Sequence, residues 1–124
     1  MASTRSFPLR YGFSRPLLSA LGMGPAFSRV DVDGDTLRVR MGWAFSAEVP
    51  LSSVKDARPH TGVVGGIGVH GWRGWWLVNG AAKDIVTIDI EPRARARVLG
   101  VPVKLRTLEV SVESPEDLIA ALRR

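Results

Sequence analysis

Apolar and polar residues alternate through much of the chain. Residues 28–32 and 37–41 both follow this pattern, and Asp33-Gly34 begins the gap between them. A period of two places every second side chain on one face of a strand. Because Asp-Gly between two such runs is typical of a tight turn, this segment predicts a β-hairpin.

Further alternating runs predict further strands, separated by glycine, proline or polar residues. The apolar side chains of residues 43–51 fall on a single face that includes Trp43. The other runs are residues 54–58, 86–90 and 107–113. Regularly spaced strands without helices between them favour a sandwich or small barrel over a parallel α/β sheet.

Proline and glycine interrupt two of the later strands. Pro92 is expected to end the strand over residues 86–90, because proline has no N–H to donate to a sheet. Gly100 and Pro102 interrupt residues 98–105. We therefore predict an edge strand or a bulged connection there.

Residues 70–80, HGWRGWWLVNG, hold three of the four tryptophans. On a strand, Trp72 and Trp76 share a wholly apolar face, whereas Trp75 shares the opposite face with Arg73. We predict that Trp76 lies in the core and that Trp75 is partly exposed, against Arg73 or a neighbouring subunit. Trp75 and Arg73 are accordingly candidate partner contacts.

Residues 114–124, SPEDLIAALRR, carry the signals of a helix. Ser114 is a typical N-cap, Pro115 suits the first helical position, and Asp117 occupies the capping-box position. The apolar stripe of this helix consists of Leu118, Ile119 and Leu122. We predict an amphipathic helix that closes one open end of the β structure.

The first 27 residues precede the regular alternation. Residues 7–13 predict a short strand, and Ser14 begins a predicted short helix that ends at Gly22. We expect a single domain in which residues 1–27 pack on residues 28–124. Glycine and proline break the apolar run PLLSALGMGP, so we expect no secretory signal, no transmembrane segment and a cytoplasmic location.

The net positive charge of the chain favours anionic partners. The chain has 17 basic and 12 acidic residues, a net charge of +5, and 14 of its basic residues are arginines. A basic surface attracts phosphate-bearing partners, although an arginine bias is also typical of a GC-rich coding sequence. The absence of cysteine excludes disulfides, thiolate zinc sites and cysteine nucleophiles.

No catalytic or cofactor-binding pattern stands out. His60 and His70 are the only histidines, and neither has a second metal ligand at helical spacing, so we expect both to be solvated or at the edge of the core. Residues 66–71 spell G-x-G-x-x-G, but no helix follows to hold a pyrophosphate. The carboxylates of the hairpin are expected to be solvated turn residues, namely Asp31, Asp33 and Asp35. We expect no enzyme, no catalytic residues, no cofactor and no metal.

One basic run has the spacing of a strand. Arg93, Arg95 and Arg97 alternate with alanine, so an extended segment projects all three from one face. Lys104 and Arg106 join the same region if the two segments pair. Such a row either grips phosphates or acidic side chains, or protects an edge strand from aggregation. These five residues are candidate partner or anion contacts.

Three segments within residues 28–124 carry a resemblance to a known family: RVDVDGDTLRVRMGW, FSAEVPLSSVKDARP and LEVSVESPEDLIAALRR. Together they resemble the small bacterial pleckstrin-homology-like (PH-like) proteins. The resemblance implies a mainly β fold, a small antiparallel barrel or bent-sheet sandwich of about seven strands closed by the C-terminal helix. It also implies a phosphoinositide site with a basic-x-Arg pair, which Arg38 and Arg40 match. Asp31 and Asp33 stand where that family places a basic residue.

These features predict a non-enzymatic binding or scaffolding module of unknown ligand that acts through contacts with a protein partner. Two alternatives stay open. One is peripheral binding to anionic lipid or other phosphate-rich ligands through the arginines. The other is an enzyme or small-ligand carrier that uses the barrel interior. Recognition of a specific nucleic acid is not expected, because stacking aromatics are few, and a homo-oligomer is compatible with the sequence.

Overall fold

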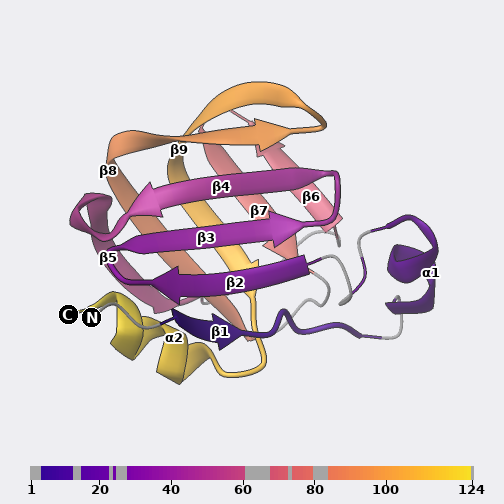
Figure 1. Cartoon of the computed structure of the whole chain (residues 1–124), viewed down its shortest axis with the longest axis horizontal. Helices are drawn as coiled ribbons and strands as arrows, with labels where there is room; N and C mark the ends of the chain where they lie inside the picture. Colours follow the sequence, from indigo (N-terminus) through magenta and orange to yellow (C-terminus); the bar gives the residue numbers. More distant parts are fainter. Residues whose placement is uncertain are drawn as a thin grey trace.

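The computed structural model describes residues 4–12, 15–22, 24, 28–60, 68–72, 74–79 and 84–123. Nine strands form one sheet in the order β1-β2-β3-β4-β8-β9-β7-β6, and β5 pairs with β8 beside this path. The strands are β1 (Thr4–Phe7), β2 (Ser28–Asp33), β3 (Thr36–Met41), β4 (Phe45–Pro50), β5 (Val54–Pro59), β6 (Gly68–Trp72), β7 (Trp75–Asn79), β8 (Ile85–Val98) and β9 (Val101–Ser111). Figure 1 shows the helices α1 (Arg15–Ala20) and α2 (Pro115–Leu122). A short 3-10 helix, η2 (Leu51–Ser53), follows β4.

The strand β8 joins two layers of a bent sheet. Residues 96–98 pair with β4, whereas residues 86–90 pair with β5. The register with β9 shifts between Asp89 and Ala94, and Pro92 lies in this bulge. Proline has no N–H to donate, and at this bulge no residue of β9 is paired with it, so no ladder hydrogen bond is lost. Pro92 therefore lies within the strand and does not end it as expected.

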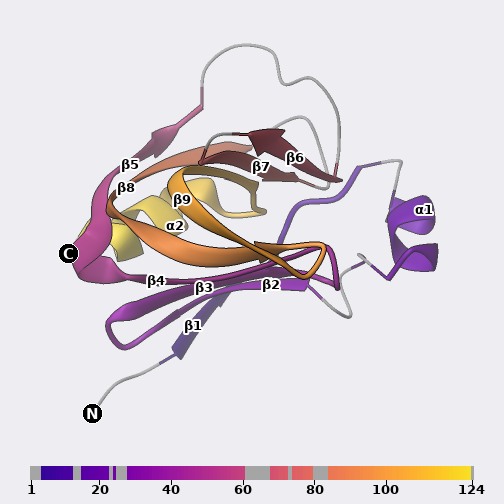
Figure 2. The ribbon, with the colours of Figure 1, turned by 90° about the horizontal axis from the view of Figure 1, so that it is seen from above.

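Figure 2 shows the two layers facing each other. The first layer is formed by β1 to β4 and the last part of β8. The second layer is formed by β5, β6, β7, the first part of β8 and the last part of β9. All neighbouring strands are antiparallel except β7 and β9, which are parallel.

Apolar side chains from both layers meet in one core. Leu37 and Val49 are direct partners in the first layer, Ile88 and Leu108 are direct partners in the second, and all four are fully buried. The helix α2 packs against β5 and β8 and adds the fully buried Leu118. The expected fold class is confirmed: a mainly β, bent sheet with a C-terminal helix, built from nine strands where about seven were expected.

The predicted hairpin forms between β2 and β3. Asp33 lies opposite Thr36, and Gly34 occupies the turn with a φ of +61°. The apolar face predicted to start at Trp43 begins later, because β4 starts only at Phe45. Trp43 lies in the preceding turn and is 61% exposed, so its prediction as part of that face is wrong.

Residues 98–105 contain a tight turn and the first part of β9. Leu99 and Gly100 both have positive φ angles, 52° and 81°. Two consecutive positive φ angles are typical of a two-residue hairpin turn. From Val101 the chain continues as β9. Among the described strands, residues 101–105 pair with β8 alone, so the predicted edge strand is confirmed there. Residues 107–110 also pair with β7 and lie inside the sheet.

The parity predicted for the tryptophans is confirmed in β7. Trp76 lies opposite the buried Leu108 and packs against the core, although it is only partly buried. Trp75 points from the other face and is 37% exposed. Its Nε1 atom donates a hydrogen bond to Oε1 of Glu109 at 2.8 Å. The side chains outside the described part include those of Trp72 and Arg73.

The N-terminal strand and the capping of α2 differ in detail from the predictions. The strand predicted over residues 7–13 is instead β1, and Leu9 forms an isolated bridge with Val112. The helix α1 spans the predicted short helix, while Ser14 lies outside the described residues. Ser114 is the N-cap of α2, but it makes no side-chain cap hydrogen bond, so the predicted capping box does not form.

Leu118→Ala removes a fully buried side chain from α2. We expect the free energy of unfolding to fall by about 2–5 kcal/mol, because the deleted atoms leave a cavity between α2 and the sheet. Glu116→Ala, at an exposed position of the same helix, should change it by less than about 0.5 kcal/mol. Urea denaturation measures both, and equal losses would contradict the packing of α2.

Candidate anion-binding surface

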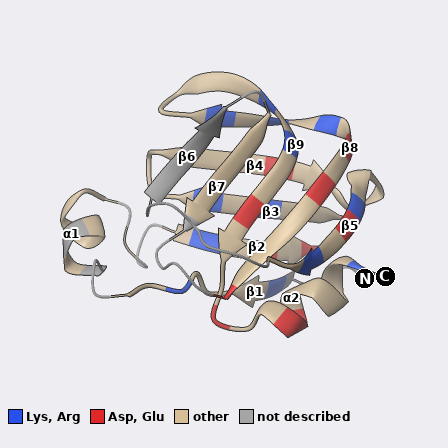
Figure 3. Ribbon diagram, turned by 180° about the vertical axis from the view of Figure 1, so that it is seen from behind, with Lys and Arg blue, Asp and Glu red and all other residues tan. Residues whose placement is uncertain are grey.

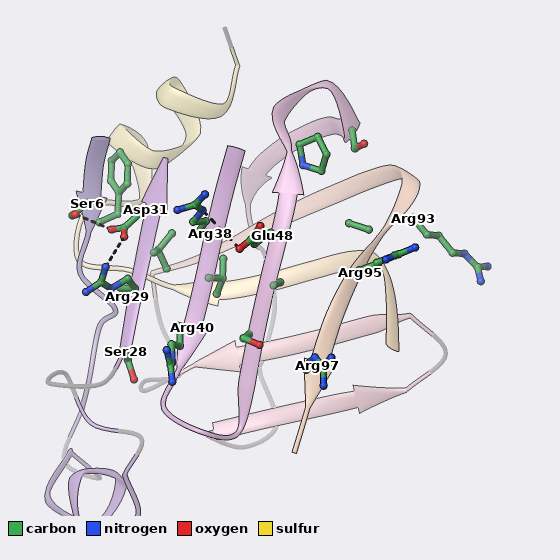
Figure 4. Close-up of a pocket in the computed structure, with 18 of the residues that line it drawn as sticks. Ser6, Ser28, Arg29, Asp31, Arg38, Arg40, Glu48, Arg93, Arg95 and Arg97 are labelled. Carbon is green, nitrogen blue, oxygen red and sulfur yellow. Dashed lines mark hydrogen bonds and ion pairs between the residues drawn. The ribbon is translucent and has the colours of Figure 1, made fainter. Parts of the chain in front are cut away.

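The outward face of the first layer is hollowed into an open depression of about 1290 Å³. Outward positions of β2, β3, β4 and β8 line it, together with Ser6 on β1. Figure 4 shows that its basic side chains come from three different strands. They are Arg29 on β2, Arg38 and Arg40 on β3, and Arg93, Arg95 and Arg97 on β8.

Three of these arginines lie in one row across four adjacent strands. Arg29 is the direct cross-strand partner of Arg40. Arg40 lies opposite Ser46 on β4, which in turn lies opposite Arg97. Direct partners project from the same face with Cβ atoms about 4.5–5.5 Å apart. We name Arg29, Arg40 and Arg97 the arginine row.

A second like-charged pair lies beside the arginine row on β8 and β9. Arg95 is directly opposite Lys104, so the two segments pair in the way that the sequence-based hypothesis required. Arg106 follows on β9, where its backbone N–H donates to the Gly74 carbonyl at 2.7 Å. Arg93 extends away from the other arginines in Figure 4. Like charges directly opposite each other destabilise a sheet, so the fold itself gains nothing from these pairs.

The acidic side chains of this face engage mainly Arg38. This guanidinium lies 3.5 Å from a carboxylate oxygen of Asp33 and 4.0 Å from one of Glu48. Asp31 is only 6% exposed and accepts a hydrogen bond from the Ser6 hydroxyl at 2.7 Å. The expectation that Asp31 is a solvated turn residue is therefore wrong, because β1 lies alongside it.

Most other cations of this face have no acidic partner in the described part of the chain. Arg29 lies 3.4 Å from Asp31, and Arg40 donates from Nε to the Gly42 carbonyl at 3.2 Å without forming an ion pair to a described residue. On β8 and β9, five exposed cations make no ion pair with any described residue: Arg93, Arg95, Arg97, Lys104 and Arg106.

The outward face of the second layer pairs its cations with acids. Arg58 on β5 donates hydrogen bonds to Asp89 and Asp56, which raise the pKa of its guanidinium above the usual value, Asp89 having the larger effect. Lys55 lies 3.9 Å from Glu91. Figure 3, which views the molecule from behind, shows acidic positions on β8 and β9 and basic positions on β5. In the described part of the chain, the cations of β5 are thus paired with acids, whereas Arg40 and the cations of β8 and β9 are not.

The second layer also holds a buried carboxylate, that of Glu109 on β9, which is 4% exposed. Its Oε1 accepts the indole hydrogen bond of Trp75, and its Oε2 accepts one from the Thr87 hydroxyl at 2.6 Å. The Nδ1 atom of His60 lies 2.6 Å from the same Oε2. Burial removes water from the carboxylate, and these hydrogen-bond partners replace it, so this cluster stabilises the outer side of β9.

Glu109 orients the imidazole of His60. Among the described residues, no free nucleophile lies beside this imidazole. The neighbouring Thr87 hydroxyl already donates to Glu109 and is therefore not a free nucleophile. Among the described residues no group of three metal-ligating side chains occurs. His60 is half-buried beside Glu109 and Thr87, and the side chain of His70 lies outside the described part.

The structure separates the residues that the sequence proposed as contacts. The first layer brings together Arg95, Arg97 and Lys104. Trp75 lies on the second layer against Glu109, and the side chain of Arg73 is not among those described. Sequence reasoning missed Arg29 and Arg40 as neighbours of Arg97, because only the cross-strand register brings them together. Their alternation with apolar residues places them on an outward face but does not identify their partners.

No protein-family model, curated protein or solved structure matches this chain. The PH-like resemblance therefore rests on the sequence segments alone. In the ranges that the structure describes, no helix is long and apolar enough to cross a membrane.

Glu109→Ala removes the acceptor that Trp75, Thr87 and His60 share. We expect the free energy of unfolding to fall by about 1–3 kcal/mol, because partly buried donors lose their partner. Thr87→Val removes a single donor with little change in volume and should cost less. Denaturation followed by circular dichroism measures both, and an unchanged midpoint for Glu109→Ala would contradict the cluster.

Proposed function

We propose that this chain is a non-enzymatic binding module that holds an anionic partner on the outward face of its first layer. The observation that carries the proposal is the presence of two like-charged cross-strand pairs, Arg29 with Arg40 and Arg95 with Lys104. Such pairs lower the stability of a sheet. Of these four cations only Arg29 has an acidic partner among the described residues, Asp31, so their presence favours a compensating contact outside the chain. Phosphate and carboxylate groups supply that contact, because guanidinium groups bind both in a bidentate geometry.

Protection of an edge strand does not account for the position of Arg97. Residues 96–98 pair with β4 on one side and with β9 on the other, so this part of β8 lies inside the sheet. An interior strand has no free row of N–H and C=O groups for a charge to shield. The arginine row is therefore better explained by an external ligand.

The shape of the surface favours an extended partner. The space between the layers is occupied by fully buried side chains such as Phe45 and Leu105, which supports binding at the outer face in preference to the interior. The arginine row crosses four strands, a span of about 15 Å at the usual spacing of strands. A protein or other large molecule that presents several anionic groups matches this span.

The phosphoinositide site implied by the PH-like resemblance is not part of this proposal. Arg38 already lies close to Asp33 and Glu48. Only Arg40 of the basic-x-Arg pair is without an acidic partner among the described residues. The proposed surface therefore combines Arg40 with Arg29 and Arg97.

The double variant Arg40→Gln/Arg97→Gln tests the surface, with soluble polyphosphate as the probe. We expect wild-type binding to be non-specific and lost at high salt, since it depends on screened charges. The variant should bind at least about tenfold more weakly, and its slope of log affinity against log salt should be shallower by about 1–2. Titration by fluorescence anisotropy at several salt concentrations gives both quantities.

A matched control removes the same charge elsewhere. Lys55→Gln/Arg123→Gln changes two exposed cations outside this face, each already near a carboxylate. Its affinity for polyphosphate should change by less than about twofold, because distant exposed charges are screened. Equal weakening of both double variants would mean that net charge alone drives binding, which contradicts the proposed surface.

A further inference from the structure

The exposed apolar side chains are unevenly distributed over the described residues. Five large ones are exposed, and four of them lie at one end of the sheet. We name these four the apolar tip: Leu21, Trp43, Leu99 and Val101, which are 49%, 61%, 60% and 59% exposed. The fifth, Trp75, lies on the second layer, where its indole N–H is bonded to Glu109.

Three segments far apart in the sequence meet at the apolar tip. The indole N–H of Trp43, in the turn between β3 and β4, donates to the carbonyl of Leu21 at 2.6 Å. The backbone N–H of Leu99, in the turn between β8 and β9, donates to the carbonyl of Ala44 at 2.9 Å. Figure 1 shows α1 and both turns at the same end of the molecule. The three segments that carry the apolar tip are therefore adjacent in space.

Leu99 is an unfavourable residue for the fold at its position. Its φ of +52° lies in the left-handed region, which favours glycine, asparagine and aspartate over bulky side chains. The core gains little in return, because the side chain is mostly exposed. An exposed apolar residue at such a position favours a contact outside the chain.

The arginine row borders the apolar tip. Arg40 is the last outward residue of β3 before the turn that holds Trp43, and Arg97 is the last outward residue of β8 before the turn that holds Leu99. Neither turn contains an acidic residue. Positive charge and apolar surface are therefore adjacent, with no negative charge in the turns themselves.

We propose that this end of the molecule docks on an anionic lipid bilayer. The inference rests on the proposed function, because it names the partner of the arginine row. Leu99 and Val101 enter the boundary between head groups and acyl chains, and Trp43 lies at the level of the head groups, where indole rings concentrate. The arginine row contacts the lipid phosphates. Since the Trp43 N–H is already bonded to Leu21, its removal from water leaves no donor unpaired.

A lipid surface accounts for both the arginine row and the apolar tip. An acidic protein would explain the arginine row but not the exposed apolar side chains beside it. A second copy of the chain would bring one arginine row towards another, which like-charge repulsion disfavours. A bilayer presents phosphate and hydrocarbon as adjacent layers, and the protein presents arginines and apolar side chains in the same order.

Co-sedimentation of the full chain compares phosphatidylcholine vesicles with vesicles that also contain about 30% phosphatidylglycerol, an anionic lipid. Leu99→Asn removes the apolar side chain and suits the positive φ, so the fold is retained. We expect it to partition about tenfold more weakly into anionic vesicles. Arg40→Gln/Arg97→Gln should partition about 25-fold more weakly, at about fivefold per arginine. Trp75→Phe, outside the apolar tip, should partition like the wild type.

Polyphosphate binding separates this inference from the proposed function, because Leu99→Asn leaves the arginine row intact. The expected result is retained polyphosphate binding with weakened vesicle binding. A wild-type chain that binds polyphosphate but not anionic vesicles, or a Leu99→Asn variant that partitions like the wild type, would overturn membrane docking alone. A smaller oligomer of Leu99→Asn in size-exclusion chromatography would also overturn it, by assigning the tip to self-association. If wild type binds neither probe, the proposed function fails as well.

Discussion

The bend in β8 is the constraint on which both faces of the molecule depend. This strand of 14 residues pairs with β5 in its first part and with β4 in its last part. The register shift that follows Asp89 lets both parts keep apolar side chains inward, with Ile88 in the first and Ala96 in the second. As a result, one strand supplies Asp89 to the outward face of the second layer and Arg97 to that of the first. The face with paired charges and the arginine-rich face are thus consequences of the same bend.

Charged side chains are paired with opposite charges on one outward face and lie beside like charges on the other. On the second layer Arg58 is held between carboxylates, and the buried Glu109 has three polar partners. On the first layer like-charged residues lie side by side, at a cost of up to about 1 kcal/mol for each cross-strand pair. A domain with a total stability of about 5–15 kcal/mol tolerates two such pairs. The domain therefore stays folded with this surface, and the arginines are available to an anionic partner.

The sequence predicts the elements whose pattern is uninterrupted, such as the first hairpin and the buried stripe of α2. It is less informative where a turn lies beside an apolar run. Gly42, with a φ of +53°, belongs to a turn that continues past Trp43, so β4 begins only at Phe45 and Trp43 lies outside the sheet. Whether Pro92 ends or bends a strand depends on the register of β9, which no local pattern records. The same holds for the site. The spacing of the arginine run places Arg97 on a face, but its position in a row with Arg40 depends on the pairing of β4 with both neighbours.

The melting temperature of Lys104→Glu at low ionic strength tests most directly the claim that the like-charged pairs cost stability. The substitution makes the pair with Arg95 attractive, and the account predicts a rise of about 2–5 °C that shrinks as salt is added, together with weaker polyphosphate binding. Arg106→Glu changes the net charge equally but has no direct cross-strand partner among the described pairs, so its rise should be smaller. A melting temperature of Lys104→Glu that is unchanged, lower, or raised no more than that of Arg106→Glu would contradict the account.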